Sequence, residues 1–205
     1  DVKYKDINGD GEIDDGRTNG VPTLDNHGDM KVIGNTTPRY QYGVRLDLTY
    51  RGFDAGIFFQ GVGKRQMWGT GQLVIPGWHY GEAYYEHHMD YWTEENPDAY
   101  YPRPWALNYQ NANPNFKKQS RYLLNMAYCR IKNLTVGYTL PENVSRKFFV
   151  SKLRVYASLE NLHTWDHLNN VPIDPETRVA SGDGGYIGRS YPFSKEYSFG
   201  LQLTF

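Results

Sequence analysis

The chain has 205 residues and a mass of 23.7 kDa, enough for one domain with a core, and its formal net charge is only -1. This charge gives no electrostatic reason to expect a nucleic-acid-binding protein or a polybasic membrane anchor. No apolar run approaches about 18 residues, which excludes a transmembrane helix. A transmembrane β-barrel remains open, because its strands are apolar only at alternate positions.

The chain starts in an acidic, polar stretch at Asp1 with no signal peptide, so we expect a cytoplasmic protein, a mature protein or a piece of one. Residues 1–38 are rich in Gly, Asp, Asn and Thr, and we interpret them as an external loop. Oxygen-bearing side chains at alternate positions there resemble a calcium-binding loop. The candidate calcium ligands are Asp6, Asn8, Asp10, Glu12 (through its backbone carbonyl) and Asp14.

Two features of this acidic loop depart from an EF-hand. Arg17 stands where a bidentate Glu is usual, although Asp15 could substitute, and no helices flank the loop. The alternative is a solvated loop whose carboxylates accept hydrogen bonds from their own backbone. We therefore expect Ca²⁺ only as an optional cofactor, and we expect no other.

Residues 39–205 are predicted to hold the strands. Apolar and polar residues alternate over residues 40–50 and again over 53–62, with a short turn at Arg51 and Gly52, which predicts a tight hairpin. A third strand is expected over residues 123–138, with a β-bulge at Lys132 and Asn133 where the apolar phase slips. The fourth and fifth strands are expected over residues 153–160 and 197–205.

Two long loops separate these strands, at residues 63–121 and 162–195. The first is rich in large aromatic residues, which could stack on a ligand or pack against a lid protein, or could pack the loop against itself. The candidate ligand or lid contacts are Trp68, Trp78, Tyr84, Tyr85, Trp92 and Trp105.

Connections after the strands alternate between short and long, which is typical of an outer-membrane barrel with short periplasmic turns and long external loops. The predicted fold is therefore all-β: an antiparallel transmembrane β-barrel fragment of about five C-terminal strands with long external loops. A soluble antiparallel sandwich with one wet face would show the same alternation.

Alternation also predicts which residues share a face. One polar set should point into a wet interior, namely Gln41, Arg45, Asp47, Thr49, Gln60, Arg154, Ser158, Glu160, Gln202 and Thr204. Leu46, Leu48, Val155 and Leu201 should face lipid instead.

Several stretches together resemble, in order and spacing, the C-terminal end of SusC-like (SusC/RagA family) TonB-linked outer-membrane transporters of Bacteroidetes. They are DINGDGEIDD, TPRYQYGVRLDLTYRGFDAGIFFQGVG, YCRIKNLTVGYTLPENV, SKLRVYASLENLHTW and EYSFGLQLTF. The final stretch also resembles the signal by which the barrel-assembly machinery recognises its clients, with candidate residues Tyr197, Phe199, Leu201, Leu203 and Phe205.

The resemblance implies a large barrel in the bacterial outer membrane that imports glycans, peptides or other nutrients under the action of TonB. It also implies a SusD-like surface lipoprotein as partner, outer-membrane lipid around the wall, and contact with TonB through an N-terminal part that this sequence lacks. The alternative function is a secreted soluble β-sheet carbohydrate-binding module, stabilised or not by calcium. No arrangement of catalytic residues stands out, so we expect no enzyme.

Overall fold

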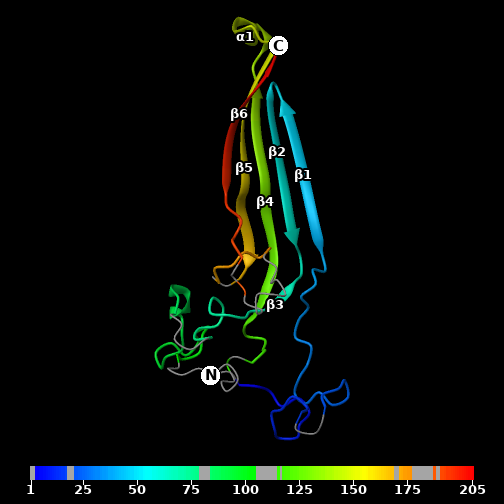
Figure 1. Ribbon diagram of the computed structural model, residues 1–205, viewed down its shortest axis with the longest axis vertical. Coiled ribbons are helices and arrows are strands. Elements are labelled where there is room, and N and C mark those ends of the chain that lie inside the picture. Colours follow the sequence, from blue (N-terminus) through cyan, green and yellow to red (C-terminus); the bar gives the residue numbers. More distant parts are fainter. Residues whose placement is uncertain are drawn as a thin grey trace. The chain divides into compact units, whose positions relative to one another are not determined.

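The computed structural model describes residues 3–17, 21–78, 84–104, 115, 117–168, 171–176, 187 and 190–205. Within them, six strands form one sheet, shown in Figure 1. The strands are β1 (Gln41–Tyr50), β2 (Phe53–Val62), β3 (Gln66–Trp68), β4 (Leu123–Thr139), β5 (Lys152–His167) and β6 (Glu196–Thr204). Their order is β1-β2-β4-β5-β6 with antiparallel neighbours, and β3 pairs with β4.

The helical elements are short. A 3₁₀ turn, η1, covers Glu86–Met89, and the β4–β5 connection contains α1 (Glu142–Ser145) followed by the 3₁₀ turn η3 (Arg146–Phe148). Across the described ranges, no helix has the length and apolar character needed to cross a membrane.

The five predicted strands are present, and the all-β antiparallel prediction is confirmed. Two expectations about the loops need correction. Strand β5 continues to His167, so the second loop begins later than residue 162. The first loop, predicted over residues 63–121, contains β3 and η1. The end of β5 was missed because of Asn161, whose left-handed backbone (φ 50°) interrupts the alternation. After this interruption β5 pairs with β4 again, from His163 onward.

The predicted bulge in β4 is confirmed and lies at Lys132. On β2, Phe58 stands opposite Asn133 and the next residue, Phe59, stands opposite Ile131. Lys132 therefore has no partner in that ladder. Since one extra residue shifts the phase of a strand, the bulge allows Arg130, Lys132 and Asn133 all to lie on the same face of the sheet.

The register sorts the sheet residues into two unlike faces. Directly opposite residues in paired strands share a face, so the pairs Asp47–Gly56, Thr135–Ser158 and Arg154–Gln202 lie together on a polar face. All ten residues predicted to point into a wet interior lie on this polar face. The opposite, apolar face carries Val44, Leu46, Leu48, Ile57, Val136, Val155, Leu201 and Leu203.

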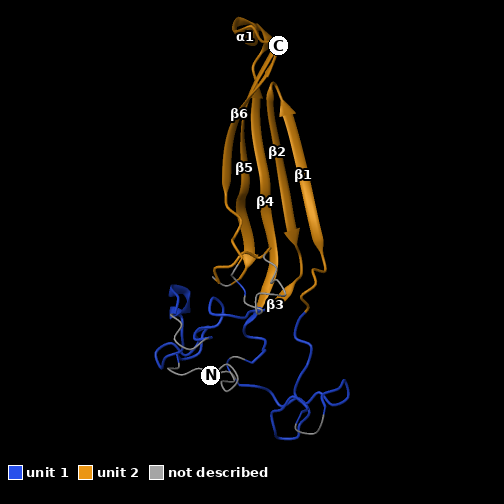
Figure 2. Cartoon of the chain, in the orientation of Figure 1, with its two compact units in different colours: residues 1–34, 68–123, 180–187 blue, residues 35–67, 124–179, 188–205 orange. Residues whose placement is uncertain are grey.

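The chain divides into two compact units, coloured separately in Figure 2. One unit combines residues 1–34, 68–123 and 180–187, and the other combines residues 35–67, 124–179 and 188–205. The first unit contains the fully buried side chains of Val74, Ile75, His88 and Tyr122. The second is the sheet with the segments that pack on it, and Met126, Arg130, Val150 and Leu168 are buried within it.

Small residues on the polar face make room for long side chains. A methyl group added to Gly137 would lie 2.5 Å from Nη2 of Arg154 and 2.7 Å from Oδ1 of Asp54. These two side chains form an ion pair across the sheet, with Nε of Arg154 donating to Oδ1 of Asp54 at 2.8 Å. Gly137 therefore leaves the space in which this pair lies.

We expect Gly137→Ala to lower the free energy of unfolding by about 1 to 3 kcal/mol, because the new methyl group displaces the guanidinium and carboxylate. Gly43→Ala is the matched control on the same face, since its methyl group would meet the ring edge of Phe58 at 3.2 Å and the carbonyl oxygen of Phe59 at an ordinary 3.7 Å. The measurement is urea unfolding of the folded protein. Equal losses for the two variants would contradict this explanation.

Candidate functional site

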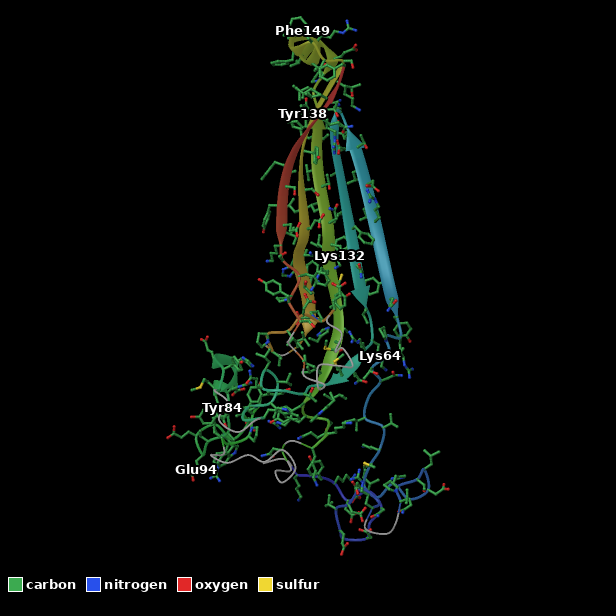
Figure 3. All side chains as sticks on the ribbon, in the orientation of Figure 1. Lys64, Tyr84, Glu94, Lys132, Tyr138 and Phe149 are labelled. Carbon is green, nitrogen blue, oxygen red and sulfur yellow. The ribbon has the colours of Figure 1, made fainter. Side chains whose placement is uncertain are left out.

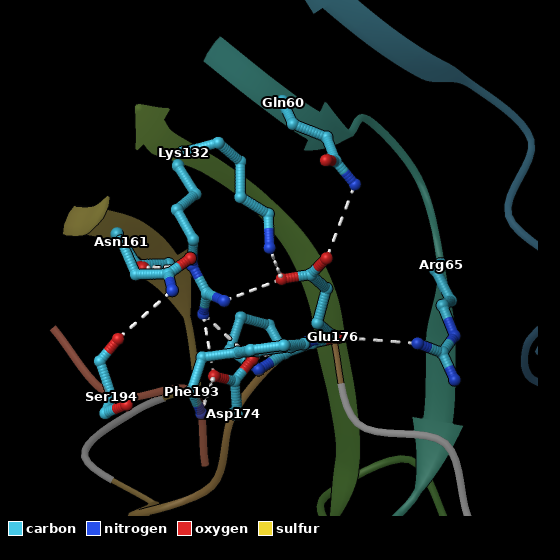
Figure 4. A network of polar contacts seen from close by, with 11 residues as sticks. Gln60, Arg65, Lys132, Asn161, Asp174, Glu176, Phe193 and Ser194 are labelled. Atoms are coloured by element: carbon cyan, nitrogen blue, oxygen red, sulfur yellow. Dashed lines mark hydrogen bonds and ion pairs between the residues drawn. The ribbon is translucent and has the colours of Figure 1, made fainter. Parts of the chain in front are cut away.

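Arg130 of β4 is the centre of a polar network on the polar face of the sheet, shown in Figure 4. Its side chain is only 4% exposed. One Nη2 donates to both carboxylate oxygens of Asp174 at 2.8 Å, Nη1 donates to Glu176 at 2.6 Å, and Nε donates to the hydroxyl of Thr164 at 2.7 Å. The guanidinium is thus satisfied by two carboxylates, of which Asp174 is 7% exposed.

Lys132 and Gln60 complete the network around Glu176. Nζ of Lys132 lies 2.8 Å from Oε2 of Glu176, and Nε2 of Gln60 donates to Oε1 at 3.3 Å. The two cations, Arg130 and Lys132, are matched by the two anions, Asp174 and Glu176. Arg130 and Lys132 are two positions apart and therefore point to the same side of β4, and the bulge places that side on the same face of the sheet as Asn133 and Thr135.

The network fastens two segments to the wall of the sheet. Residues 171–176 supply both carboxylates, and Nη1 of Arg65 donates to the carbonyl of Pro175 at 3.3 Å. The ring of Phe193 lies 4.2 Å from Nζ of Lys132 and 5.3 Å from Cζ of Arg130, and Nδ2 of Asn161 donates to the carbonyl of Ser194. Every charge in the network has an internal partner, so the arrangement fits loop anchoring rather than acid–base chemistry.

Sequence reasoning did not select these residues as a site. The acidic pair Asp174 and Glu176 is visible in the second long loop, and Arg130 and Lys132 are visible on the third strand. Their separation by more than forty positions hid the pairing. Two features of the sequence could have indicated the pairing. Arg130 and Lys132 lie at the predicted bulge, and Asp174 and Glu176 lie close together in the second long loop.

Other side chains of the polar face also bond to one another. Nε of Arg45 donates to Asp47 at 2.8 Å, and both side chains are largely exposed. Asn133 and Thr135 share hydrogen bonds with the hydroxyl of Ser158. That this face lines a wet lumen remains a prediction.

The acidic loop adopts the alternative arrangement, in which carboxylates bond to backbone. Asp6 accepts hydrogen bonds from the amides of Gly9 and Gly11, and Asn8 and Asp10 accept from amides two residues further on. Among the described residues, no group of three or more His, Cys, Asp or Glu side chains could hold a metal ion. Calcium binding by Asp6, Asn8, Asp10, Glu12 and Asp14 stays a prediction.

Asp29 closes this acidic loop from outside the predicted set. Its carboxylate accepts hydrogen bonds from the amides of Ile7 and Asp14, and these bonds lower the pKa of Asp29. The sequence pattern missed Asp29 because it lies fifteen positions beyond Asp14.

The described aromatic residues of the first long loop pack largely among themselves. Trp68 lies 6.3 Å from Tyr122, and Tyr85 stacks on His87 at 5.7 Å, while Tyr84 and Trp92 stay partly exposed. Trp78 is half-buried and Trp105 lies outside the described residues. Ligand or lid contact by any of these six rings stays a prediction.

His88 lies in the middle of this aromatic cluster. Nδ1 accepts a hydrogen bond from the amide of Tyr85 at 3.2 Å, and the ring of Tyr101 stands edge-on at 5.0 Å. Burial among these rings, aided by the neighbouring His87, lowers the pKa of His88 to about 4. Burial raises the pKa of Tyr101 and of Tyr122 in the same cluster. With its pKa at about 4, the His88 ring is uncharged at neutral pH.

The predicted assembly-signal residues Tyr197, Phe199, Leu201, Leu203 and Phe205 all have exposed side chains at the end of the chain. Four of them lie in β6 on the apolar face, and Phe205 follows its last residue. Recognition by the assembly machinery stays a prediction.

Removal of one partner of the buried network should be strongly destabilising. We expect Asp174→Ala to cost about 3 to 5 kcal/mol, because it leaves the Arg130 guanidinium buried with one fewer anion. The exposed Arg45–Asp47 pair offers the control, since Asp47→Ala should cost much less than Asp174→Ala. Urea denaturation of the folded protein measures both, and comparable losses would show that the network is not an anchor.

The lowered pKa of His88 makes the stability of its unit pH-dependent. The unfolded state takes up a proton near pH 6.5 and the folded state only near pH 4, so stability is fully present above pH 6.5 and falls as the pH drops toward 4. An NMR titration should show the His88 ring signals constant from pH 7 to about 5. Titration of His88 near pH 6.5 in the folded protein would contradict its burial.

No family model matches the chain, but individual relatives do. Over 210 residues it is 29% identical to TonB-dependent receptor P3 of Formosa agariphila, and over 211 residues it is 27% identical to TonB-dependent receptor P26 of the same organism. These matches cover 98% and 100% of this chain. The chain spans only 19% of the length of either receptor.

Solved structures agree with these relatives. The RagAB peptide transporter matches with a TM-score of 0.61 and 25% identity, covering 86% of this chain and 18% of that one. The RagAB peptide importer in its open-open state has a TM-score of 0.60 and 24% identity, covering 93% and 20%. By sequence and by fold, therefore, the resemblance to SusC-like TonB-dependent receptors is confirmed, and the chain corresponds to about a fifth of such a receptor.

Proposed function

We propose that this chain forms part of the barrel wall of a TonB-dependent transporter that imports nutrients across the bacterial outer membrane. One observation carries the proposal: the sheet has a polar face with internally paired charges and an apolar face that is exposed. Leu48 is 73% exposed and Phe199 is 85% exposed. Contiguous apolar surface of this kind is typical of proteins that contact a membrane or another protein.

Strand length supports contact with lipid. Strands β1 and β2 each have ten residues, and a barrel strand needs about 9 to 11 to cross the hydrocarbon core. In both strands successive residues point to opposite faces, so each strand supplies one apolar row and one mainly polar row, with Phe58 as an apolar residue on the polar face. A bilayer on one side and a watery lumen on the other account for both rows.

The two outer strands also need further partners. In the described sheet, β1 pairs with β2 alone and β6 with β5 alone. Open edges cannot remain in a bilayer, because their amides and carbonyls would lack hydrogen bonds. Additional strands of a larger barrel would satisfy them, in keeping with receptors about five times longer than this chain.

The finer assignments rest on the relatives. The matched solved structures are described as a peptide transporter and a peptide importer, which supports peptides, beside glycans, as the substrate class. A SusD-like surface lipoprotein would cover the barrel, and TonB would act through a part of the receptor outside this chain. The relatives are receptors, which agrees with a function in transport rather than catalysis. A secreted soluble module is disfavoured, because it would leave the apolar face in water.

The location is tested by fractionation of native cells with an antibody against residues 84–104. We expect the antigen in the outer membrane, in a heat-modifiable band several times heavier than 23.7 kDa. A soluble band near the mass of this chain would overturn the proposal.

Two neighbouring substitutions, one on each face of β1, test which face meets lipid. We expect Leu46→Lys to cost about 2 to 4 kcal/mol in a bilayer, because it places a cation in hydrocarbon near the midplane. Arg45→Leu, one position away on the polar face, should have a smaller effect on folding. Unfolding in lipid measures both variants, and the reverse order would invert the assignment of the faces.

A further inference from the structure

The β4–β5 connection presents two phenylalanines that the fold does not bury. Phe148 is exposed and Phe149 is 93% exposed, although their neighbours Ser145 and Val150 are buried. Figure 3 labels Phe149 at the end of the connection. Hydrophobic collapse of the connection would have covered these rings rather than its serine.

Phe149 is held out by an unusual backbone. It caps η3 with φ 58° and ψ 28°, the left-handed conformation, which a residue with a bulky side chain rarely adopts. Its amide donates to the carbonyl of Arg146, and the amide of Val150 donates to the carbonyl of Ser145. These two hydrogen bonds explain the left-handed backbone as a helix C-cap, but they leave the Phe149 ring 93% exposed, so the ring is available for an external contact.

Cationic residues occur at the same end of the sheet as these rings. Arg146 and Lys147 precede Phe148 directly, and Arg146 forms an i,i+4 pair with Glu142. Arg51 belongs to the same end of the sheet, because Gly52 in its turn accepts a hydrogen bond from the amide of Thr139 at the end of β4. Among the described residues, no ion pair engages Lys147 or Arg51.

This end of the sheet also carries aromatic residues on its apolar face. Tyr50 and Phe53 are exposed next to the turn, and Cζ of Arg51 lies 5.2 Å from the centre of the Tyr50 ring. Exposed aromatic rings beside cations are the combination that favours the boundary between acyl chains and phosphate headgroups.

We propose that the β4–β5 connection is a membrane-interface anchor: Phe148 and Phe149 insert at the edge of the acyl region, and Lys147 and Arg51 contact phospholipid phosphates. The inference rests on the proposed barrel, because it requires this end of the sheet to meet a bilayer. The occupant is a phospholipid leaflet rather than a protein, since the rings are flanked by cations that match phosphate in charge.

The test uses spin labels in the intact membrane-inserted protein, in vesicles of phosphatidylethanolamine and phosphatidylglycerol. Cys129→Ala removes the native thiol, and single labels are placed through Phe149→Cys, Leu48→Cys and Glu142→Cys. The measurement compares how readily oxygen, which enters the acyl region, and a water-soluble nickel chelate reach each label. The ratio of the two reports the depth of the label in the bilayer. Leu48 tests the barrel itself, and Glu142 is the matched aqueous control on the same connection.

We expect the labels at positions 149 and 48 to favour oxygen and the label at 142 to favour nickel. If position 48 favours oxygen but 149 behaves like 142, the anchor is wrong and the barrel stands. If 48 also favours nickel, the proposed function fails and the anchor with it. A label at 149 that neither reagent reaches would indicate a protein partner and overturn the lipid proposal.

A separate variant tests the proposed contact between Lys147 and lipid phosphate. Lys147→Glu should shift the label at position 149 toward nickel accessibility without changing the label at position 48, because the new carboxylate repels lipid phosphate. An unchanged label at 149 would overturn the role of Lys147 in headgroup contact.

Discussion

The antiparallel register of β4 with β2 and β5 is the constraint on which the rest of the sheet depends. Strand residues alternate between faces, and directly opposite residues share one, so a single register fixes the facing of every residue in these strands. A slip by one position would carry Leu134 to the polar face and Thr135 to the apolar face. Because one face of the sheet is polar and the other apolar, the sequence strongly favours a single register.

The bulge at Lys132 changes which side chains of β4 reach the polar face. A perfect β4 would alternate its side chains throughout, and Lys132 and Asn133 could not both reach the polar face. With the bulge, Arg130 and Lys132 share the polar face with Asn133 and meet Asp174 and Glu176 there. The ion pairs are worth little as a source of stability by themselves, since desolvation offsets their attraction. They specify where the segments at 171–176 and 190–195 meet the wall.

The two faces impose different demands on a protein of this kind. A wall that separates lipid from a watery passage needs polar groups bonded to each other on one side and none on the other. The pairs Arg45–Asp47 and Arg154–Asp54 meet the first demand, and the rows of Leu and Val on β1, β5 and β6 meet the second. This division of labour connects the fold directly with the proposed function in transport.

The sequence by itself determined five strands, their facing and the bulge, because these follow from local alternation with a period of two, but it did not indicate β3 or the last part of β5. The resemblance to TonB-dependent receptors was also readable from ordered short stretches. Tertiary structure alone decided the partners of Arg130, the closure of the acidic loop by Asp29, and the burial of His88. Each of these joins residues from separate segments of the chain, and no local pattern encodes which distant carboxylate or ring a side chain will meet.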